Sequence, residues 1–232
     1  MIVFLVLSMQ GATAQELEGF FSNTDSFLKT NIANGRVNYV AVKNNPETLF
    51  SLVDAANNIR VEKTDASNYQ AFWINTYNIL VIKGIVKNYP LKSPLDVSGF
   101  FDKIRYEVGG ENITLNDIEN KLLRGNFPKE ARFHFVLVCA GLGCPPIINK
   151  AYKPATLDQQ LQKQTEKAIN DANFIRLAKN KVKISQIFEW YKGDFQQNGD
   201  VVDFINLYKI KKLPEKVKVS YYPYDWTLNE IK

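Results

Sequence analysis

The spacing of hydrophobic and polar positions predicts helices in the first third of the chain. Apolar residues three and four positions apart predict amphipathic helices over 17–32 and 46–59. The segment 69–86 differs, because it is apolar on every side, with Asn75 and Asn78 among its few polar residues. A helix that is apolar all round lies buried in the core of a larger protein. We therefore expect 69–86 to be the central helix of the fold.

Later in the chain, short alternating segments predict strands. Residues 101–115 alternate around Gly109-Gly110 and predict a hairpin, and residues 174–184 predict a second one. Residues 133–139 are apolar on both faces, which is typical of a central strand, and 217–222 alternate like an edge strand. Further helices are expected over 115–124, 157–170, 187–191 and 201–208.

This order of elements determines the expected fold class. Helices come first and the strands come as hairpins, so the pattern predicts an α+β fold rather than alternating βαβ units. We expect a buried central helix packed on a small, mostly antiparallel sheet, with several surface helices. No repeat, low-complexity stretch or linker interrupts residues 15–232, so this range is expected to form a single domain.

The first residues have the pattern of an export signal. A run of hydrocarbon side chains, 2–7, leads to the small-x-small site 12–14 just before Gln15. No Lys or Arg precedes the run, and a buried N-terminal strand is the alternative. We expect Met1–Ala14 to be a signal peptide and residues 15–232 to be exported, to the periplasm or the extracellular space. No later run reaches the ~18 apolar residues of a membrane span, so none is expected in the mature chain.

Composition and charge narrow the classes of function. The 232 residues are 45% hydrophobic and 23% charged, which is typical of globular proteins and excludes disordered and fibrous classes. The net charge of +5 is mild, and the basic cluster 209–212 is short and flanked by apolar residues. We therefore expect the charge to be solvated surface and expect no nucleic-acid partner.

The single histidine and the two cysteines limit the chemistry further. Cys139 and Cys144 are five positions apart, and with His134 they match no zinc spacing. The loop at Gly143 continues Cys-Pro-Pro, and prolines cannot supply the N–H groups that hold a phosphate. We expect no metal site and no cofactor.

Three states of the cysteines stay open. Cys139 and Cys144 form a short disulfide loop, both are buried thiols, or Cys144 is a nucleophile with His134 as its base. Alternation along the predicted strand places Cys139 on the core face, opposite His134. His134 and Cys139 would lie ~17 Å apart in an extended strand, so contact with Cys144 requires the loop to fold back along it. We expect His134 to be buried and paired with a carboxylate, Glu119 being favoured over Asp117.

Asn75 and Asn78 are three positions apart and share one face of the central helix. A buried amide without hydrogen-bond partners is costly, so each must bond a loop, a side chain or a ligand. Bracing of an adjacent loop is one interpretation, and ligand binding is the other.

Several motifs occur in a recognisable order. They are Ala71-Phe72-Trp73-Ile74-Asn75-Thr76-Tyr77-Asn78, Leu115-Asn116-Asp117-Ile118-Glu119, His134-Phe135 leading to Cys139 and Cys144-Pro145-Pro146, Ile187-Phe188-Glu189-Trp190-Tyr191 with Asp194-Phe195, and Tyr224-Asp225-Trp226-Thr227-Leu228-Asn229. Together they resemble the domain-of-unknown-function family 547 over about residues 35–232.

The resemblance implies a polar signature but no settled activity. Asn75, Glu119, His134 and Cys144 belong to that signature, whether for fold or for chemistry. Residues 130–132 read Glu-Ala-Arg, where the family usually has Asp-Pro-Arg before its histidine. This departure affects only the start of the histidine segment.

Two functions from different classes follow. The first is a thiol-dependent hydrolase of amide or ester bonds, papain-like in outline. Cys144 would be the nucleophile and His134 the base, and Glu119 or Asn75 would orient the imidazole. Its pocket would form where the loop 141–146 meets the central helix, and the N–H groups of Gly143 and Cys144 would stabilise an oxyanion. The expected substrate-binding residues are Asn75, Asn78, Trp73 and Gly143.

The second function is a non-catalytic extracytoplasmic module. Its tyrosines and its aromatic tail, 222–226, would bind a peptide or a glycan. In both hypotheses the partner is a small molecule, a peptide or a glycan.

The export pattern makes the first testable prediction. Because the small-x-small site ends at Ala14, the exported protein should begin at Gln15 or within two residues of it. N-terminal sequencing of secreted material measures this directly. Recovery of Met1 would contradict the prediction.

Overall fold

The structure is a computed structural model that describes residues 3–214 and 216–232. Its helices are α1 (Val3–Asn31), α2 (Tyr39–Asn44), α3 (Glu47–Asn58), α4 (Ala66–Asn88), η1 (Pro94–Asp96), α5 (Leu115–Asp117), η2 (Ile118–Arg124), η3 (Ala131–Phe135), η4 (Pro154–Thr156), α6 (Leu157–Asn170), α7 (Ile187–Trp190), α8 (Lys192–Phe195) and α9 (Val201–Tyr208). Its strands are β1 (Ile32–Ala33), β2 (Arg36–Val37), β3 (Arg105–Val108), β4 (Glu111–Thr114), β5 (Ile175–Ala178), β6 (Lys181–Ser185) and β7 (Lys218–Tyr222).

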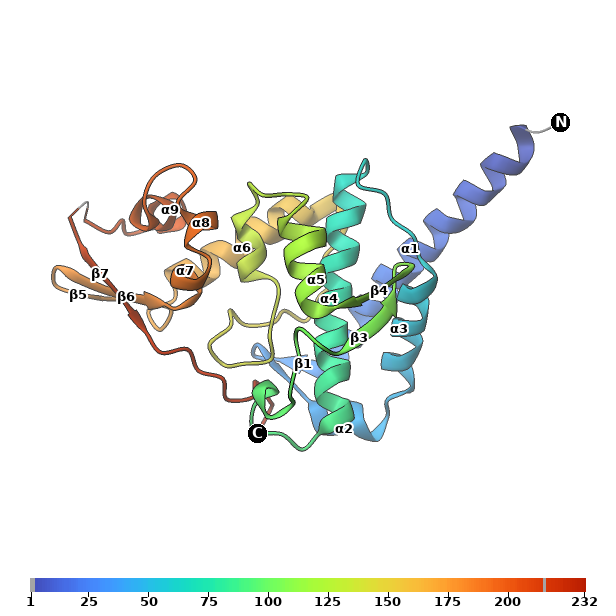
Figure 1. Cartoon of the computed structure of the whole chain (residues 1–232), viewed down its shortest axis with the longest axis horizontal. Coiled ribbons are helices and arrows are strands. Elements are labelled where there is room, and N and C mark those ends of the chain that lie inside the picture. Colours follow the sequence, from blue (N-terminus) through green and yellow to red (C-terminus); the bar gives the residue numbers. More distant parts are fainter. Residues whose placement is uncertain (1–2, 215) are drawn as a thin grey trace.

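Helix α4 is the centre of the fold, as its apolar pattern predicts. Every side chain from Ala71 to Ile82 is buried, and Asp65 caps the helix by accepting a hydrogen bond from the Asn68 N–H. Helices α1, α2 and α3 pack on one side of α4, and α5 and η2 contact it on another (Figure 1). The α+β class is confirmed.

The strands form small sheets rather than a single one. Within the described residues, β1–β2 and β3–β4 are antiparallel hairpins, and β5–β6–β7 is a mixed sheet in which β7 runs parallel to β6 at the edge. Both predicted hairpins are present. Gly109 and Gly110 have positive φ in the β3–β4 turn, and a Cβ on Gly109 would lie only 2.4 Å from the Trp73 indole. Glycine therefore lets this hairpin pack tightly against α4.

The prediction of a central strand over 133–139 is wrong. Residues 131–135 form the 3₁₀ turn η3, and the chain continues to Cys139 without a strand partner. The Asn78 amide replaces that partner, because it donates to the Val136 carbonyl and accepts from the Val138 N–H, both at 2.9 Å. Residues 133–139 are apolar on all sides, but burial in a sheet is not the cause.

The cause is their position between two hydrophobic clusters. The larger cluster surrounds α4 and includes Phe133, whereas the smaller one lies among α6, α9 and the β5–β7 sheet and includes Phe135. His134 lies between these two phenylalanines in the sequence. A segment that enters two cores needs apolar residues on both faces, and this pattern is indistinguishable from that of a buried strand.

The C-terminal segment joins distant parts of the molecule. It runs from β7 back toward β1 and β2 (Figure 1). The Asn229 carbonyl accepts from the Val37 N–H at 3.0 Å, and the Asn229 N–H donates to the Ala140 carbonyl at 2.8 Å. Leu142 and Gly143 donate their N–H groups to the carbonyls of Thr227 and Asp225. The loop after residue 139 is therefore fixed by the tail of the chain.

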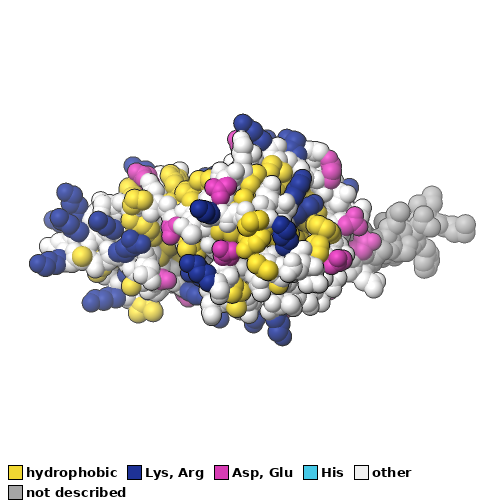
Figure 2. Space-filling model, turned by 90° about the horizontal axis from the view of Figure 1, so that it is seen from below, with side chains coloured by type: hydrophobic (Ala, Val, Ile, Leu, Met, Phe, Trp, Pro, Cys, Tyr) yellow, Lys and Arg dark blue, Asp and Glu magenta, His cyan; other side chains and the backbone are white. Residues whose placement is uncertain are grey.

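Met1 and Ile2, which begin the predicted signal peptide, lie outside the described residues. Residues 3–14 belong to α1, and export stays a prediction. In the ranges that the structure covers, no helix combines the length and apolar character needed to cross a bilayer. Lys and Arg side chains gather at the end that carries β5–β7 (Figure 2), where Lys181 lies opposite Lys218.

The buried amides of α4 make the second prediction. Asn75 accepts from the Tyr152 N–H at 3.0 Å and donates to the Tyr152 carbonyl at 2.7 Å. Asn75→Leu should lower the free energy of unfolding by roughly 1–3 kcal/mol, because those backbone groups would be left buried without partners. Asn58→Leu is the control, since exposed Asn58 bonds only the Asp54 carbonyl, and it should stay within ~0.5 kcal/mol of wild type. Equal denaturation midpoints for the two variants would contradict the prediction.

Candidate functional site

His134 is buried and paired with a carboxylate, as expected, but the partner is Asp194 rather than Glu119. Its Nε2 lies 2.7 Å from Asp194 Oδ2, and Arg124 Nε lies 2.6 Å from the same oxygen. The expectation of Glu119 is wrong because η3 turns the imidazole toward α8, which is 60 positions further along the chain. Because His134 and Asp194 are so far apart in the sequence, no local spacing of residues predicts that they pair.

The surroundings of Asp194 favour its ionised form. Burial raises the pKa of this carboxyl, but hydrogen bonds and charge from His134 and Arg124 outweigh burial and hold the pKa well below its usual value. The ionised carboxylate therefore accepts a hydrogen bond from the N–H at Nε2 of His134, which leaves Nδ1 as the ring nitrogen without this partner. The Tyr191 ring lies 4.0 Å from the imidazole, centroid to centroid, and Arg124 lies over the same tyrosine.

The two cysteines are free thiols grouped around one tyrosine. The Tyr224 hydroxyl lies 2.9 Å from the sulfur of Cys139 and 2.9 Å from that of Cys144. The Cys139 N–H also donates to the Cys144 sulfur at 3.0 Å. Both sulfurs therefore contact the same hydroxyl group, and both cysteines are half-buried.

The thiols differ in acidity. Burial raises the pKa of Cys144 well above its usual value, and the neighbouring Cys139 sulfur raises it further. Burial also raises the pKa of Cys139, but hydrogen bonds from Cys144, Tyr224 and the Gly141 N–H outweigh it and lower the pKa. Of the two thiols, Cys139, which the sequence pattern places in the core, is therefore the more easily ionised.

One small cavity brings the thiols and the imidazole together. Its volume is about 60 Å³. Its lining residues are Glu119, His134, Leu137, Cys139, Cys144, Ile187, Trp190, Tyr191, Tyr224 and Trp226. The structure thus gathers the three expected catalytic residues, Cys144, His134 and Glu119, around a single space, with Cys139 beside them.

A wider groove of about 460 Å³ adjoins this cavity. It is lined by Phe101, Asn116, Glu119, Asn120, Cys139, Trp190, Tyr191 and Trp226. Five of these residues also line the inner cavity, so the groove leads to it. Cys139 borders both spaces, whereas Cys144 borders the cavity and a separate hollow at its other side.

Three of the expected substrate-binding residues do not reach this site. The Asn75 amide bonds Tyr152 and the Ala71 carbonyl, and the Asn78 amide bonds Val136 and Val138. Trp73 packs under the β3–β4 hairpin at Gly109. Bracing of loops, the alternative left open by the sequence, is the role that their contacts support.

Gly143 lies in the loop beside Cys144, but its N–H group is already engaged. It donates to the Asp225 carbonyl at 2.7 Å, and the Cys144 N–H donates to the Gly141 carbonyl at 3.2 Å. The expected oxyanion hole from these two donors is therefore not formed, because the loop and the tail use both of them.

The hydrolase hypothesis from the sequence gives no role to five residues of the site, whereas the binding hypothesis includes only the tyrosines and the aromatic tail among them. These are Asp194, Tyr191, Trp190, Tyr224 and Trp226, which border the imidazole, the thiols or the groove. All five lie in the last two motifs that carried the family resemblance. Their presence in these motifs was the only sequence signal that they matter, and it did not indicate which residues they contact.

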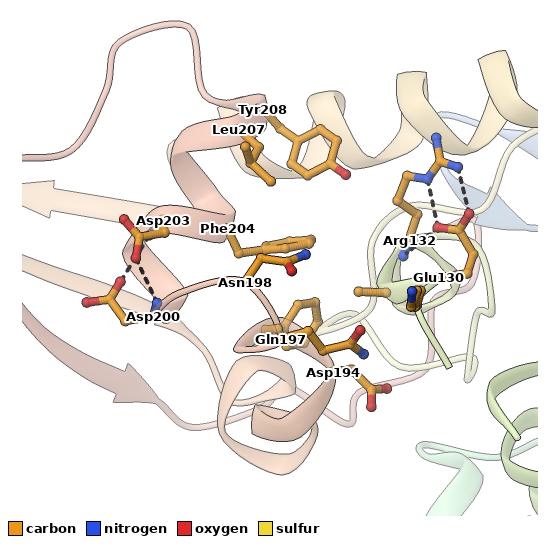
Figure 3. Close-up of a pocket in the computed structure, with 13 residues that line it drawn as sticks. Glu130, Arg132, Asp194, Gln197, Asn198, Asp200, Asp203, Phe204, Leu207 and Tyr208 are labelled. Atoms are coloured by element: carbon orange, nitrogen blue, oxygen red, sulfur yellow. Dashed lines mark hydrogen bonds and ion pairs between the residues drawn. The ribbon is translucent and has the colours of Figure 1, made fainter. Parts of the chain in front are cut away.

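A second hollow of about 400 Å³ lies between η3 and α9 (Figure 3). Most of its charged groups already have partners, since Arg132 forms two hydrogen bonds with Glu130, and Asp200 and Asp203 cap α9. It contains neither thiol nor imidazole. Among the residues covered by the structure, no three His, Cys, Asp or Glu side chains gather in a way that would hold a metal ion.

Comparison with known families agrees with the motifs. Residues 61–169 match the family described as "Protein of unknown function, DUF547", so the predicted resemblance is confirmed over this part of the chain. No curated protein and no solved structure gives a match.

The pairing of His134 with Asp194 makes the third prediction. Because its folded pKa is depressed, Asp194 stabilises the fold fully above the pKa of a free aspartate, ~3.9, and loses this contribution as the pH falls toward the folded value. Asp194→Asn should therefore melt below wild type at pH 7, and the difference should shrink below about pH 4. Thermal melts across pH measure this, with exposed Asp102→Asn as a control that should leave the melting temperature unchanged. A difference that is constant with pH would contradict the assignment.

Proposed function

We propose that the protein is a thiol-dependent hydrolase of amide or ester bonds. The observation that carries the proposal is the shared cavity, in which two thiols and an imidazole oriented by Asp194 line the same space. A nucleophile, a base and a group that orients the base are the parts that covalent acyl transfer requires.

Cys139 is the better nucleophile of the pair. It borders the groove through which a substrate would approach, and its pKa is lowered, whereas that of Cys144 is raised. Cys144 then acts as a hydrogen-bond donor that stabilises the thiolate. This departs from the sequence-based hypothesis, in which Cys144 is the nucleophile.

The proton path follows from the histidine geometry. Asp194 holds Nε2, so the Cys139 proton passes to Nδ1 as the sulfur adds to the substrate carbonyl. The imidazolium then protonates the leaving amine or alcohol, and a thioester forms on Cys139. Water attacks this thioester while Nδ1 takes up its proton, the carboxylic acid leaves, and the thiol is restored.

Tyr224 is the donor best placed for the oxyanion. Burial raises the pKa of its hydroxyl well above the usual value, so the group stays protonated at neutral pH and remains a donor. It lies 2.9 Å from each sulfur and therefore beside any carbonyl that the thiolate attacks.

A second candidate function is the non-catalytic module that binds a peptide or a glycan. The engaged N–H groups of Gly143 and Cys144 favour it, because a hydrolase commonly uses backbone donors beside its nucleophile. The aromatic groove serves either function.

We also propose that Met1–Ala14 direct export to the periplasm or the extracellular space, on the strength of the apolar run and the small-x-small site.

The fourth prediction tests the hydrolase. Reduced wild-type protein mixed with p-nitrophenyl acetate should release a burst of about one p-nitrophenolate per chain, because acyl transfer to Cys139 precedes hydrolysis of the thioester. Cys139→Ser should abolish the burst. Replacement of the base by His134→Gln should slow acylation by a factor of about 10²–10⁴.

Cys144→Ser is the matched control, since it removes the neighbouring thiol and leaves Cys139 in place. It should retain the burst at a reduced rate. Mass spectrometry of the trapped thioester identifies the acylated residue. A burst that survives in Cys139→Ser and disappears in Cys144→Ser would restore Cys144 as the nucleophile, and no burst in wild type would favour the binding module.

A further inference from the structure

We infer that the groove binds a cationic group of the substrate, such as a quaternary ammonium or the side chain of a lysine or arginine. The residues that border it are aromatic or amide-bearing, apart from Cys139 and one charged residue, the carboxylate of Glu119. Aromatic rings and a single carboxylate around one space are the chemistry that recognises organic cations.

The aromatic side chains offer their surfaces to the groove. Trp190 is 47% exposed, and its ring lies 6.1 Å from that of Trp226, which in turn lies 6.1 Å from Phe101. The negative face of an indole attracts a cation within about 6 Å of the ring centre. An exposed tryptophan beside other rings is also costly to leave hydrated, so a ligand that covers it gains apolar contact as well.

The ion pairs around the groove leave the Glu119 carboxylate without a direct cationic partner. Arg124 and His134 both pair with Asp194, and among the described residues Glu119 forms no ion pair, although it interacts with the Tyr191 hydroxyl and with the charge of nearby Arg124. The side chains of the groove residues Asn116 and Asn120 bond each other, with Asn120 Nδ2 donating to Asn116 Oδ1 at 2.7 Å, and Asn120 Oδ1 accepts from Arg124. The groove therefore contains one carboxylate that no direct ion pair neutralises, in a protein whose net charge is positive.

This inference rests on the proposed function and names its substrate class. Cys139 borders the same groove as Glu119, so a cation held there presents the adjoining ester or amide to the thiol. Glu119, which the sequence had assigned to the imidazole, then acts in specificity, because Asp194 already orients the ring.

Binding is tested without any scissile bond. Choline and its neutral isostere 3,3-dimethylbutan-1-ol are titrated separately into the full chain, and tryptophan fluorescence is recorded. We expect choline to bind about tenfold more tightly than the alcohol, because only the ammonium gains from the rings and the carboxylate. Choline should also slow alkylation of Cys139 by iodoacetamide, since both occupy the groove.

Glu119→Gln keeps the shape of the side chain and removes its charge. It should abolish the preference for choline and leave the affinity for the neutral alcohol unchanged. Glu111→Gln, at an exposed position on β4 outside the groove, is the matched control and should retain the full preference.

The outcomes separate this inference from the hydrolase. Equal affinity for the two compounds in wild type, or a preference that persists in Glu119→Gln, would overturn the cation site even if the burst with p-nitrophenyl acetate is found. A choline preference that depends on Glu119 without any burst would support the cation site and reject the hydrolase.

Discussion

Two amide side chains on one buried helix hold the irregular part of this fold together. Backbone that passes through a core without a sheet has N–H and C=O groups that need partners. Asn78 bonds the carbonyl of Val136 and the N–H of Val138, as a residue of a neighbouring strand would, and Asn75 does the same for both groups of Tyr152. Helix α4 thereby fixes loops on either side of the thiols, and the sulfur atoms depend on it for their positions.

The site lies at the boundary between two hydrophobic clusters because its residues come from both. The thiols lie on the loop after η3, beside the larger cluster. Asp194, on α8, and Tyr191, between α7 and α8, come from the part of the chain packed on the smaller one. A boundary of this kind leaves small spaces that neither core fills, and polar groups can be buried there with partners from the opposite side. This explains how one buried histidine meets a carboxylate 60 positions away.

The local sequence pattern predicted most helices and strands correctly. It failed where contacts between distant parts of the chain determine the structure. Helix α4, both hairpins and the edge strand β7 follow from periodicity and turn residues, because those signals act within a few positions. The strand expected at 133–139 was wrong because burial between two cores imitates burial within a sheet. The gathering of Cys144, His134 and Glu119 was anticipated from motifs, but Asp194 was not, since only the folded chain brings α8 to η3.

The C-terminal segment that fixes the thiol loop is synthesised after that loop, so the site can be enclosed only late. The Tyr39 hydroxyl bonds the Asn229 side chain across 190 positions, and the bonds from the loop 140–143 are to residues 225–229. A ribosome adds only ~5–20 residues each second, so α4 and the cysteines emerge several seconds before the residues that enclose them. During that interval the reactive sulfurs are open to oxidants and to other nascent chains. Residues 225–229 therefore enclose the thiol loop only after the rest of the site has been synthesised, and contacts over such long sequence separations form more slowly than local ones as a rule.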